Sequence, residues 1–149
     1  MKKNLIEISL VTEVDANLVA SFAQLFPQLT HNNAPPDADL LQQIVQAQNS
    51  HILIARDTAS YGRIVGTLTL AFYISPTGIK AWIEDVVVDS SYRGKGIGKT
   101  LTKEAIALAK KEKAKAVLLT SNPARVAANE LYQKLGFSLR ETNLYQLKL

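Results

Sequence analysis

Residues 83–100 read IEDVVVDSSYRGKGIGKT, an apolar strand followed by a glycine-rich turn and the start of a helix. The run Val86-Val87-Val88 is apolar on both faces, which is typical of a central strand that helices cover on both sides. Beyond the turn, apolar side chains recur at spacings of three and four and predict an amphipathic helix over residues 96–112. These apolar positions are Ile97, Leu101, Ala105 and Leu108.

Three glycines alternate in the turn, at Gly94, Gly96 and Gly98. The amino end of a helix has unpaired backbone N–H groups and a partial positive charge, and glycines let that backbone approach a phosphate closely. Tight packing of the turn is the alternative explanation for the glycines. We expect a phosphate site, with a pyrophosphate as the ligand of matching size.

Two well-known phosphate motifs do not fit this turn. A P-loop that ends in Gly98-Lys99-Thr100 needs a glycine where Arg93 stands. A dinucleotide fingerprint that starts at Gly94 or Gly96 needs a glycine where the chain has Lys99 or Leu101. The sequence therefore excludes both motifs.

The positive charge of the chain is concentrated around the same turn. Residues 93–115 hold eight lysines and arginines and two acids, whereas the rest of the chain is slightly acidic and the total is +4. Runs of charge are often solvated helix faces, and that alternative stays open here. Together with the glycines, the window favours a local anion site.

The remaining chain alternates strand and helix patterns. The expected strands are residues 4–11, 51–56, 64–74, 79–89, 116–120 and 144–147, with a further short strand at Phe137. The expected helices are residues 14–26, a helix capped by Asp37 or Asp39, residues 96–112, and residues 124–135 ending before Gly136. This order predicts an α/β domain built on a mixed sheet.

Composition limits the class of protein. A chain of 149 residues, 47% hydrophobic and 20% charged, is typical of one globular domain, expected here over residues 1–149. The absence of cysteine excludes thiolate catalysis, cysteine-bound metals and a disulfide framework. The first residues carry Glu7 where a signal peptide needs apolar side chains, and the longest apolar run has five residues, against about 18 for a membrane span. We expect a soluble, cytoplasmic protein that has no membrane partner.

Two segments resemble the signatures of the GCN5-related N-acetyltransferases (GNATs). Arg93-x-x-Gly96-x-Gly98, placed between a strand and a helix, looks like the acetyl-coenzyme A signature of that family. Residues 129–137, NELYQKLGF, resemble its second signature near the carboxyl end. The resemblance covers residues 79–137. It implies an α/β (α+β) fold whose mixed, mostly antiparallel sheet has six to seven strands and is flanked by about four helices.

The resemblance implies an N-acetyltransferase that moves acetyl from acetyl-CoA directly to an amine in a ternary complex, without a metal. Backbone N–H groups of the glycine turn would bind the diphosphate, and the pantetheine amides would pair with the preceding strand. The residues implied to contact acetyl-CoA are Val86, Val87, Val88, Arg93, Gly94, Lys95, Gly96, Ile97, Gly98, Lys99, Thr100, Asn129 and Tyr132.

An amine is mostly protonated at neutral pH, so the reaction needs a base. Glu84 and Asp85 are neighbours on a strand and point to opposite faces unless a bulge intervenes. We favour Glu84 as the base, directly or through water, with Asp85 as the second choice. The alternative is that one of the two carboxylates binds the substrate ammonium and neither is a base. A backbone N–H near Val86 is expected to stabilise the oxyanion.

The leaving thiolate needs a proton, which a phenol can donate because it stays protonated at neutral pH. Tyr132 occupies the position of that acid in the family, and a residue on the rim of an amphipathic helix is the alternative. Asn129 precedes it by three positions, on the same helical face, where its amide is expected to bond pantetheine. Arg125 either reaches the cofactor or lies free on the surface.

No motif names the acceptor. A small-molecule primary amine is our interpretation, and peptide or protein amines (N-termini or lysines) are the first alternative. A non-catalytic acyl-CoA sensor is the alternative from another class. Nucleic acid is disfavoured because only Tyr92 offers an aromatic ring near the basic window. The resemblance and the commonness of two-fold assemblies leave a homodimer open.

Overall fold

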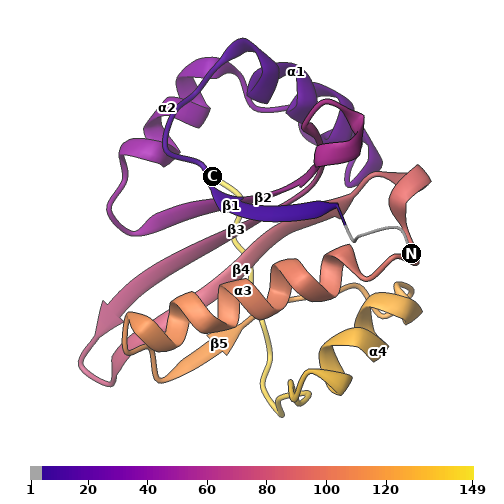
Figure 1. Ribbon diagram of the computed structural model, residues 1–149. Helices are drawn as coiled ribbons and strands as arrows, with labels where there is room; N and C mark the ends of the chain where they lie inside the picture. Colours follow the sequence, from indigo (N-terminus) through magenta and orange to yellow (C-terminus); the bar gives the residue numbers. More distant parts are fainter. Residues whose placement is uncertain (1–4) are drawn as a thin grey trace.

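A mixed sheet of five strands forms the centre of the computed structural model, which describes residues 5–149 (Figure 1). The strands lie in sequence order, antiparallel from the first to the fourth, and the fifth pairs in parallel with the fourth. They are β1 (Ile6–Leu10), β2 (Ser50–Asp57), β3 (Arg63–Ser75), β4 (Gly78–Val88) and β5 (Ala116–Leu118). The cover expected on both faces of Val86-Val87-Val88 is confirmed, because Val86 and Val88 pack in one buried cluster and Val87 in the other, although β5 pairs with β4 only over residues 80–82.

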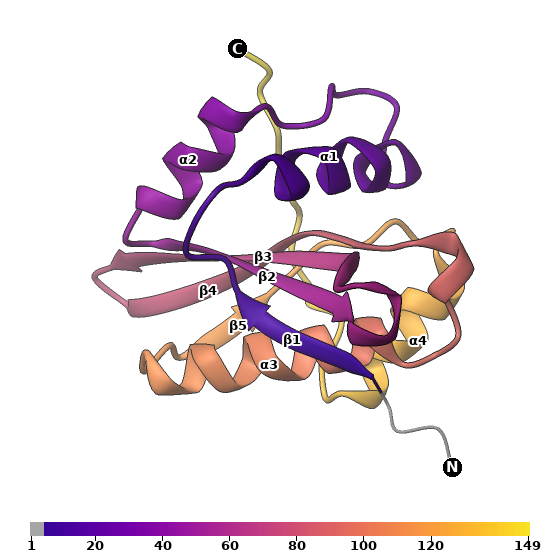
Figure 2. The same cartoon turned by 45° about the horizontal axis from the view of Figure 1, so that its top comes forward.

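Helices cover both faces of the sheet. Figure 2 shows α1 and α2 on one face and α3 on the other, with α4 near the amino end of α3. The helices are α1 (Ala16–Leu25), α2 (Ala38–Gln46), α3 (Ile97–Lys111) and α4 (Val126–Lys134). Asp37, one of the two expected caps, accepts a hydrogen bond from the Leu40 N–H at 2.8 Å.

Each face has its own cluster of buried side chains. On one face, Leu101 and Ala105 of α3 pack against strand residues that include Leu68. On the other, Phe22 of α1 and Leu41 of α2 pack against a different set of strand residues. The sheet therefore separates two hydrophobic clusters, one for each helical layer.

The sheet has fewer strands than the six to seven expected. The structure forms no strand over residues 144–147 and none at Phe137, and the fifth strand ends at Leu118 rather than at residue 120. Alternating apolar residues need a neighbouring edge to pair with, and β5 offers only a three-residue edge. The tail instead runs past the sheet with Leu144 74% and Leu147 85% exposed (Figure 1). Residues 1–4, including the expected start of the first strand at Asn4, lie outside the described residues.

Candidate active site

A cleft of about 840 Å³ opens where the end of β4, the amino end of α3 and helix α4 meet. It is called the main cleft below. It brings together most of the residues expected to contact the cofactor. These are Val86, Val87, Val88, Arg93, Gly94, Gly96, Ile97, Gly98, Lys99 and Tyr132.

The glycine turn has a backbone that L side chains rarely adopt. Gly94 has φ +76° and Gly96 has φ +78°, and Gly96 is the residue that begins α3. A Cβ atom on either glycine would meet no atom within 4 Å, so the space above them is open. Within residues 5–149, no side chain caps the amino end of α3, which leaves its first N–H groups available to an anion. The turn therefore fits a phosphate.

Tyr92 anchors the turn to the sheet. Its hydroxyl donates a hydrogen bond to Asp57 Oδ2 at 2.7 Å. Lys95 Nζ lies 4.8 Å from the centre of the Tyr92 ring, and Arg63 Cζ lies 5.7 Å from it, as in cation–π contacts. The hydrogen bond from Tyr92 is the main cause that lowers the pKa of Asp57. These contacts join the turn to Asp57 and Arg63 of the sheet. They leave the backbone of Gly94 and Gly96 uncovered.

Asp89 is a second anchor, at the junction between β4 and the turn. Its carboxylate accepts hydrogen bonds from the Ser91 hydroxyl and N–H, and forms an ion pair with Arg63 at 3.1 Å. Gln28, which follows α1, donates to the same carboxylate and accepts from the Ser90 N–H at 2.8 Å. The Ser91 hydroxyl is the main cause that lowers the pKa of Asp89, and burial opposes it.

Asp89 should contribute to acid unfolding. A carboxyl whose pKa is lower in the folded state stabilises the fold above its unfolded pKa, and this contribution is lost as the pH falls through the folded pKa. Asp89→Asn is expected to lower the free energy of unfolding at neutral pH by about 1 kcal/mol. Urea unfolding between about pH 6 and about pH 2 should then show a flatter acid limb than in the wild type. Parallel curves for the two proteins would exclude this role.

A bulge in β4 lies at the two acidic residues Glu84 and Asp85. Thr67 pairs with Val87 and Thr69 with Glu84, so β4 holds one residue more than β3 between these pairs. Asp85 lies in this bulge with φ +50°. Glu84 and Asp85, which a regular strand would point to opposite faces, therefore both line one pocket.

This second pocket, called the side pocket below, has a volume of about 290 Å³. Leu29, Thr30 and Asn33, from the connection between α1 and α2, line it opposite the sheet residues. Desolvation, and secondly the charge of Asp85, raises the pKa of Glu84. A carboxylate that is easier to protonate is a better proton acceptor near neutral pH.

The two pockets meet at shared residues. Val86, Arg125 and Tyr132 line both of them, together with Leu29. Tyr132 is 8% exposed, and its ring packs edge to face on Phe137 with centroids 5.8 Å apart. Burial raises the pKa of Tyr132, and the charge of Arg125 opposes that rise. The phenol therefore stays protonated at neutral pH at the junction of the two pockets.

Three residues expected at the cofactor do not line either pocket. Lys95 lies against Tyr92, and the Thr100 hydroxyl donates to the Gly96 carbonyl at 3.0 Å. The Asn129 amide donates to the carbonyls of Asn122 and Arg125. Asn129 therefore braces the segment that leads into α4, and its contact with pantetheine stays a prediction.

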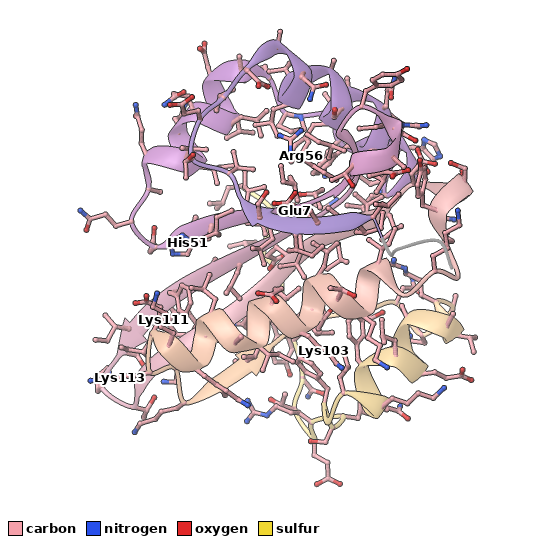
Figure 3. The ribbon with its side chains drawn as sticks, viewed as in Figure 1. Glu7, His51, Arg56, Lys103, Lys111 and Lys113 are labelled. Carbon is pink, nitrogen blue, oxygen red and sulfur yellow. The ribbon has the colours of Figure 1, made fainter. Side chains whose placement is uncertain are left out.

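The basic window is divided by the fold. Figure 3 shows Lys103, Lys111 and Lys113 spread along the outside of α3, with Lys111 and Lys113 at the end opposite the glycine turn. All three side chains are exposed. Only the residues at the start of the window, among them Arg93 and Lys99, line the main cleft. The far part of the window is therefore a solvated helix face, and the predicted anion site is limited to the near part.

The anchors of the turn had no signal in the sequence. Asp57 lies 35 residues before Tyr92, and Gln28 lies 61 residues before Asp89. In one sequence, neither spacing marks a contact. Within residues 5–149, no group of three or more His, Cys, Asp or Glu side chains is placed to hold a metal ion. No helix of that range has the length and apolarity that a membrane crossing requires.

The chain is similar in sequence to known proteins. Curated relatives include a glucosamine 6-phosphate N-acetyltransferase from Trypanosoma brucei brucei, 38% identical over 86 residues, or 56% of each chain. An N-acetylaspartate synthetase from Danio rerio is 33% identical over 102 residues, which cover 52% of this chain and 36% of that protein. The chain thus spans about half or less of the curated relatives it matches.

The fold is also found among solved structures. An aminoglycoside acetyltransferase from an uncultured soil metagenomic sample, in complex with sisomicin, superposes with a TM-score of 0.82 at 21% identity, over 98% of this chain and 97% of that one. The family model of the GNAT acetyltransferases matches residues 17–137. The strand, glycine turn and helix that hold the cleft lie inside this match, and the chain belongs to the GNAT family of acetyltransferases.

Proposed function

We propose that the protein transfers the acetyl group of acetyl-CoA directly to the primary amine of a small molecule. The observation that carries this proposal is the meeting of two pockets at Tyr132 and Val86, one lined by the glycine turn and one lined by Glu84 and Asp85. The small volume of the side pocket, about 290 Å³, favours a small acceptor over a protein chain. The names of the curated relatives, for glucosamine 6-phosphate and N-acetylaspartate, also favour a small amine.

The main cleft has the groups that acetyl-CoA needs. The glycine turn and the first N–H groups of α3 would bind the diphosphate, with Arg93 and Lys99 adding positive charge. β5 pairs with β4 only as far as Trp82, so within the described chain no strand pairs with residues 86–88 on that side, and the Val88 carbonyl accepts a hydrogen bond from Arg93 Nε at 3.2 Å. Pantetheine amides would bond to this free edge, as an added strand does.

The side chains then supply two proton transfers. Glu84 would accept a proton from the substrate ammonium, directly or through water, so that the amine nitrogen can attack the acetyl carbonyl carbon. The Val86 N–H would stabilise the negative charge that develops on the carbonyl oxygen. When the carbon–sulfur bond breaks, Tyr132 would give its proton to the thiolate. The nitrogen then loses its second proton, which would return through water to the Tyr132 phenolate, while Glu84 releases the first proton to solvent. The acceptor leaves as an amide, and coenzyme A leaves as a thiol.

The dependence of the rate on pH tests the role of Glu84. A base must be deprotonated to act, so kcat/KM is expected to fall as the pH drops through the raised pKa of Glu84, above the range of an ordinary glutamate. Glu84→Gln should lower kcat by about 10²-fold or more and remove this acid limb. Asp85→Asn should keep the limb but move it to lower pH, because the Asp85 charge helps to raise the pKa of Glu84. A limb that persists in Glu84→Gln and vanishes in Asp85→Asn would assign the base to Asp85.

Calorimetry with the cofactor tests the proposal as a whole. Acetyl-CoA should bind, and acetyl-pantetheine, which lacks the diphosphate and nucleotide, should bind at least about ten-fold more weakly. Thiol release should then appear when small amines are added. Binding of acetyl-CoA without thiol release from any amine would favour the acyl-CoA sensor, and binding of neither ligand by the folded protein would exclude the acetyltransferase.

A further inference from the structure

The side pocket contains charges of both signs. Glu84 and Asp85 supply two carboxylates, which suit the ammonium of an acceptor. Arg125 is the only basic side chain among the residues that line this pocket within the described chain. An acceptor with an amine alone would match the carboxylates and leave the guanidinium without a counter-charge.

The N–H groups of the Arg125 side chain have no bonding partner among the described residues. Its side chain forms no ion pair and no hydrogen bond with any residue between 5 and 149. Its backbone is fixed, because its N–H donates to the Asn122 carbonyl at 2.9 Å and its carbonyl accepts from the Asn129 amide at 2.8 Å. A guanidinium offers five N–H groups in a planar fork that matches a carboxylate or a phosphate. The backbone of Arg125 is thus fixed at the pocket, and its exposed guanidinium is available to bond a ligand.

Arg125 lines both the main cleft and the side pocket, at the junction of the two. The side pocket includes none of the residues of the glycine turn. The turn has its own cations, Arg93 and Lys99, in the main cleft. Arg125 shares the side pocket with Tyr132, and its charge opposes the rise that burial causes in the pKa of Tyr132, so it lies near the proposed site of reaction.

We infer that Arg125 selects acceptors that carry an anionic group, a carboxylate or a phosphate, on the same small molecule as the reacting amine. The ammonium would lie at Glu84 and Asp85, and the anion would accept hydrogen bonds from the Arg125 fork. Asn129 is a positioning residue in this arrangement, since it holds the Arg125 carbonyl. The inference rests on the proposed acetyltransferase function and narrows its substrate class.

Matched pairs of amines test the inference. The pairs are glucosamine 6-phosphate with glucosamine, phosphoethanolamine with ethanolamine, and aspartate with its diamide, each assayed by thiol release from acetyl-CoA. In at least one pair, kcat/KM of the wild type should be about 10- to 100-fold higher for the anionic member. Arg125→Gln should bring this ratio close to one, chiefly through KM, and Arg125→Lys should retain part of it. Arg140→Gln, a change of an exposed arginine outside both pockets, is the matched control.

The outcomes separate the inference from the proposed function. Equal or better use of the neutral amines in all pairs would overturn the inference while acetyl transfer stands. An equal loss for both members of a pair in Arg125→Gln, together with weaker acetyl-CoA binding by calorimetry, would assign Arg125 to the cofactor instead. Thiol release from no amine at all, with acetyl-CoA bound, would overturn the proposed function and this inference with it.

Discussion

Tyr132→Phe is expected to lower kcat by about 10²- to 10³-fold, because the departing thiolate would lose its proton donor. Acetyl-CoA binding should stay within about two-fold, since the ring keeps its shape and its contact with Phe137. Within residues 5–149, the Tyr132 hydroxyl makes no hydrogen bond to another residue. Removing it therefore costs no internal bond, and the thermal midpoint should not change.

The measurement is steady-state kinetics beside calorimetry on the same preparations. Tyr73→Phe is the matched control, because Tyr73 lies exposed on β3 and lines neither pocket. Its kcat should equal that of the wild type. If Tyr132→Phe keeps the wild-type kcat while product release is shown not to limit the rate, Tyr132 is a packing residue and another group protonates the thiolate.

Gly96→Val is expected to weaken acetyl-CoA binding by about 100-fold. Gly96 has φ +78°, where a β-branched side chain is strained, and the open space above it is where a phosphate would lie. The valine methyls would fill that space, and the backbone would turn its N–H groups away. Losing one or two charge-assisted hydrogen bonds corresponds to a change of this size.

Gly62→Val separates strain from ligand contact. Gly62 has φ +72° and also open space around its Cβ position, but it lies in the β2–β3 connection and lines neither pocket. Both variants should lose about 1–2 kcal/mol of stability from the left-handed backbone. Only Gly96→Val should raise the dissociation constant of acetyl-CoA. Equal affinities in the two variants would contradict the assignment of the turn to the diphosphate.

The sequence predicted those helices and strands whose spacing, caps and end residues are typical of one type of element. The helix from Gly96 was visible because its apolar spacing, its glycine start and its buried partner strand all agree. A cap at Asp37 or Asp39 was predicted because a side-chain oxygen can satisfy an N–H three residues away, and the structure uses Asp37. The strand at residues 144–147 was predicted wrongly, since alternation shows a preference for extended backbone but does not show whether an edge is available to pair with it.

The residues of the site also fall into two groups, those that the sequence predicted and those that only the structure reveals. The glycine turn and Tyr132 were found from short motifs, and both line the main cleft. That Glu84 and Asp85 share one pocket depends on an extra residue in β4, which only the pairing with β3 reveals. The contacts of Asp57 with Tyr92 and of Gln28 with Asp89 join distant parts of the chain, and one sequence contains no record of such pairs.

The separation of the two buried clusters has a consequence for how new specificities evolve. The cluster around Phe22 supports the layer whose connection lines the side pocket, while the cluster around Leu101 supports the glycine turn. Substitutions more than about 7–10 Å apart that share no partners have nearly additive effects on stability, which applies to helix residues on opposite faces of the sheet. Mutation and selection can therefore change the α1–α2 layer for another amine with little effect on the half of the molecule that holds the turn, provided that Gln28, which bonds Asp89 and Ser90, is kept.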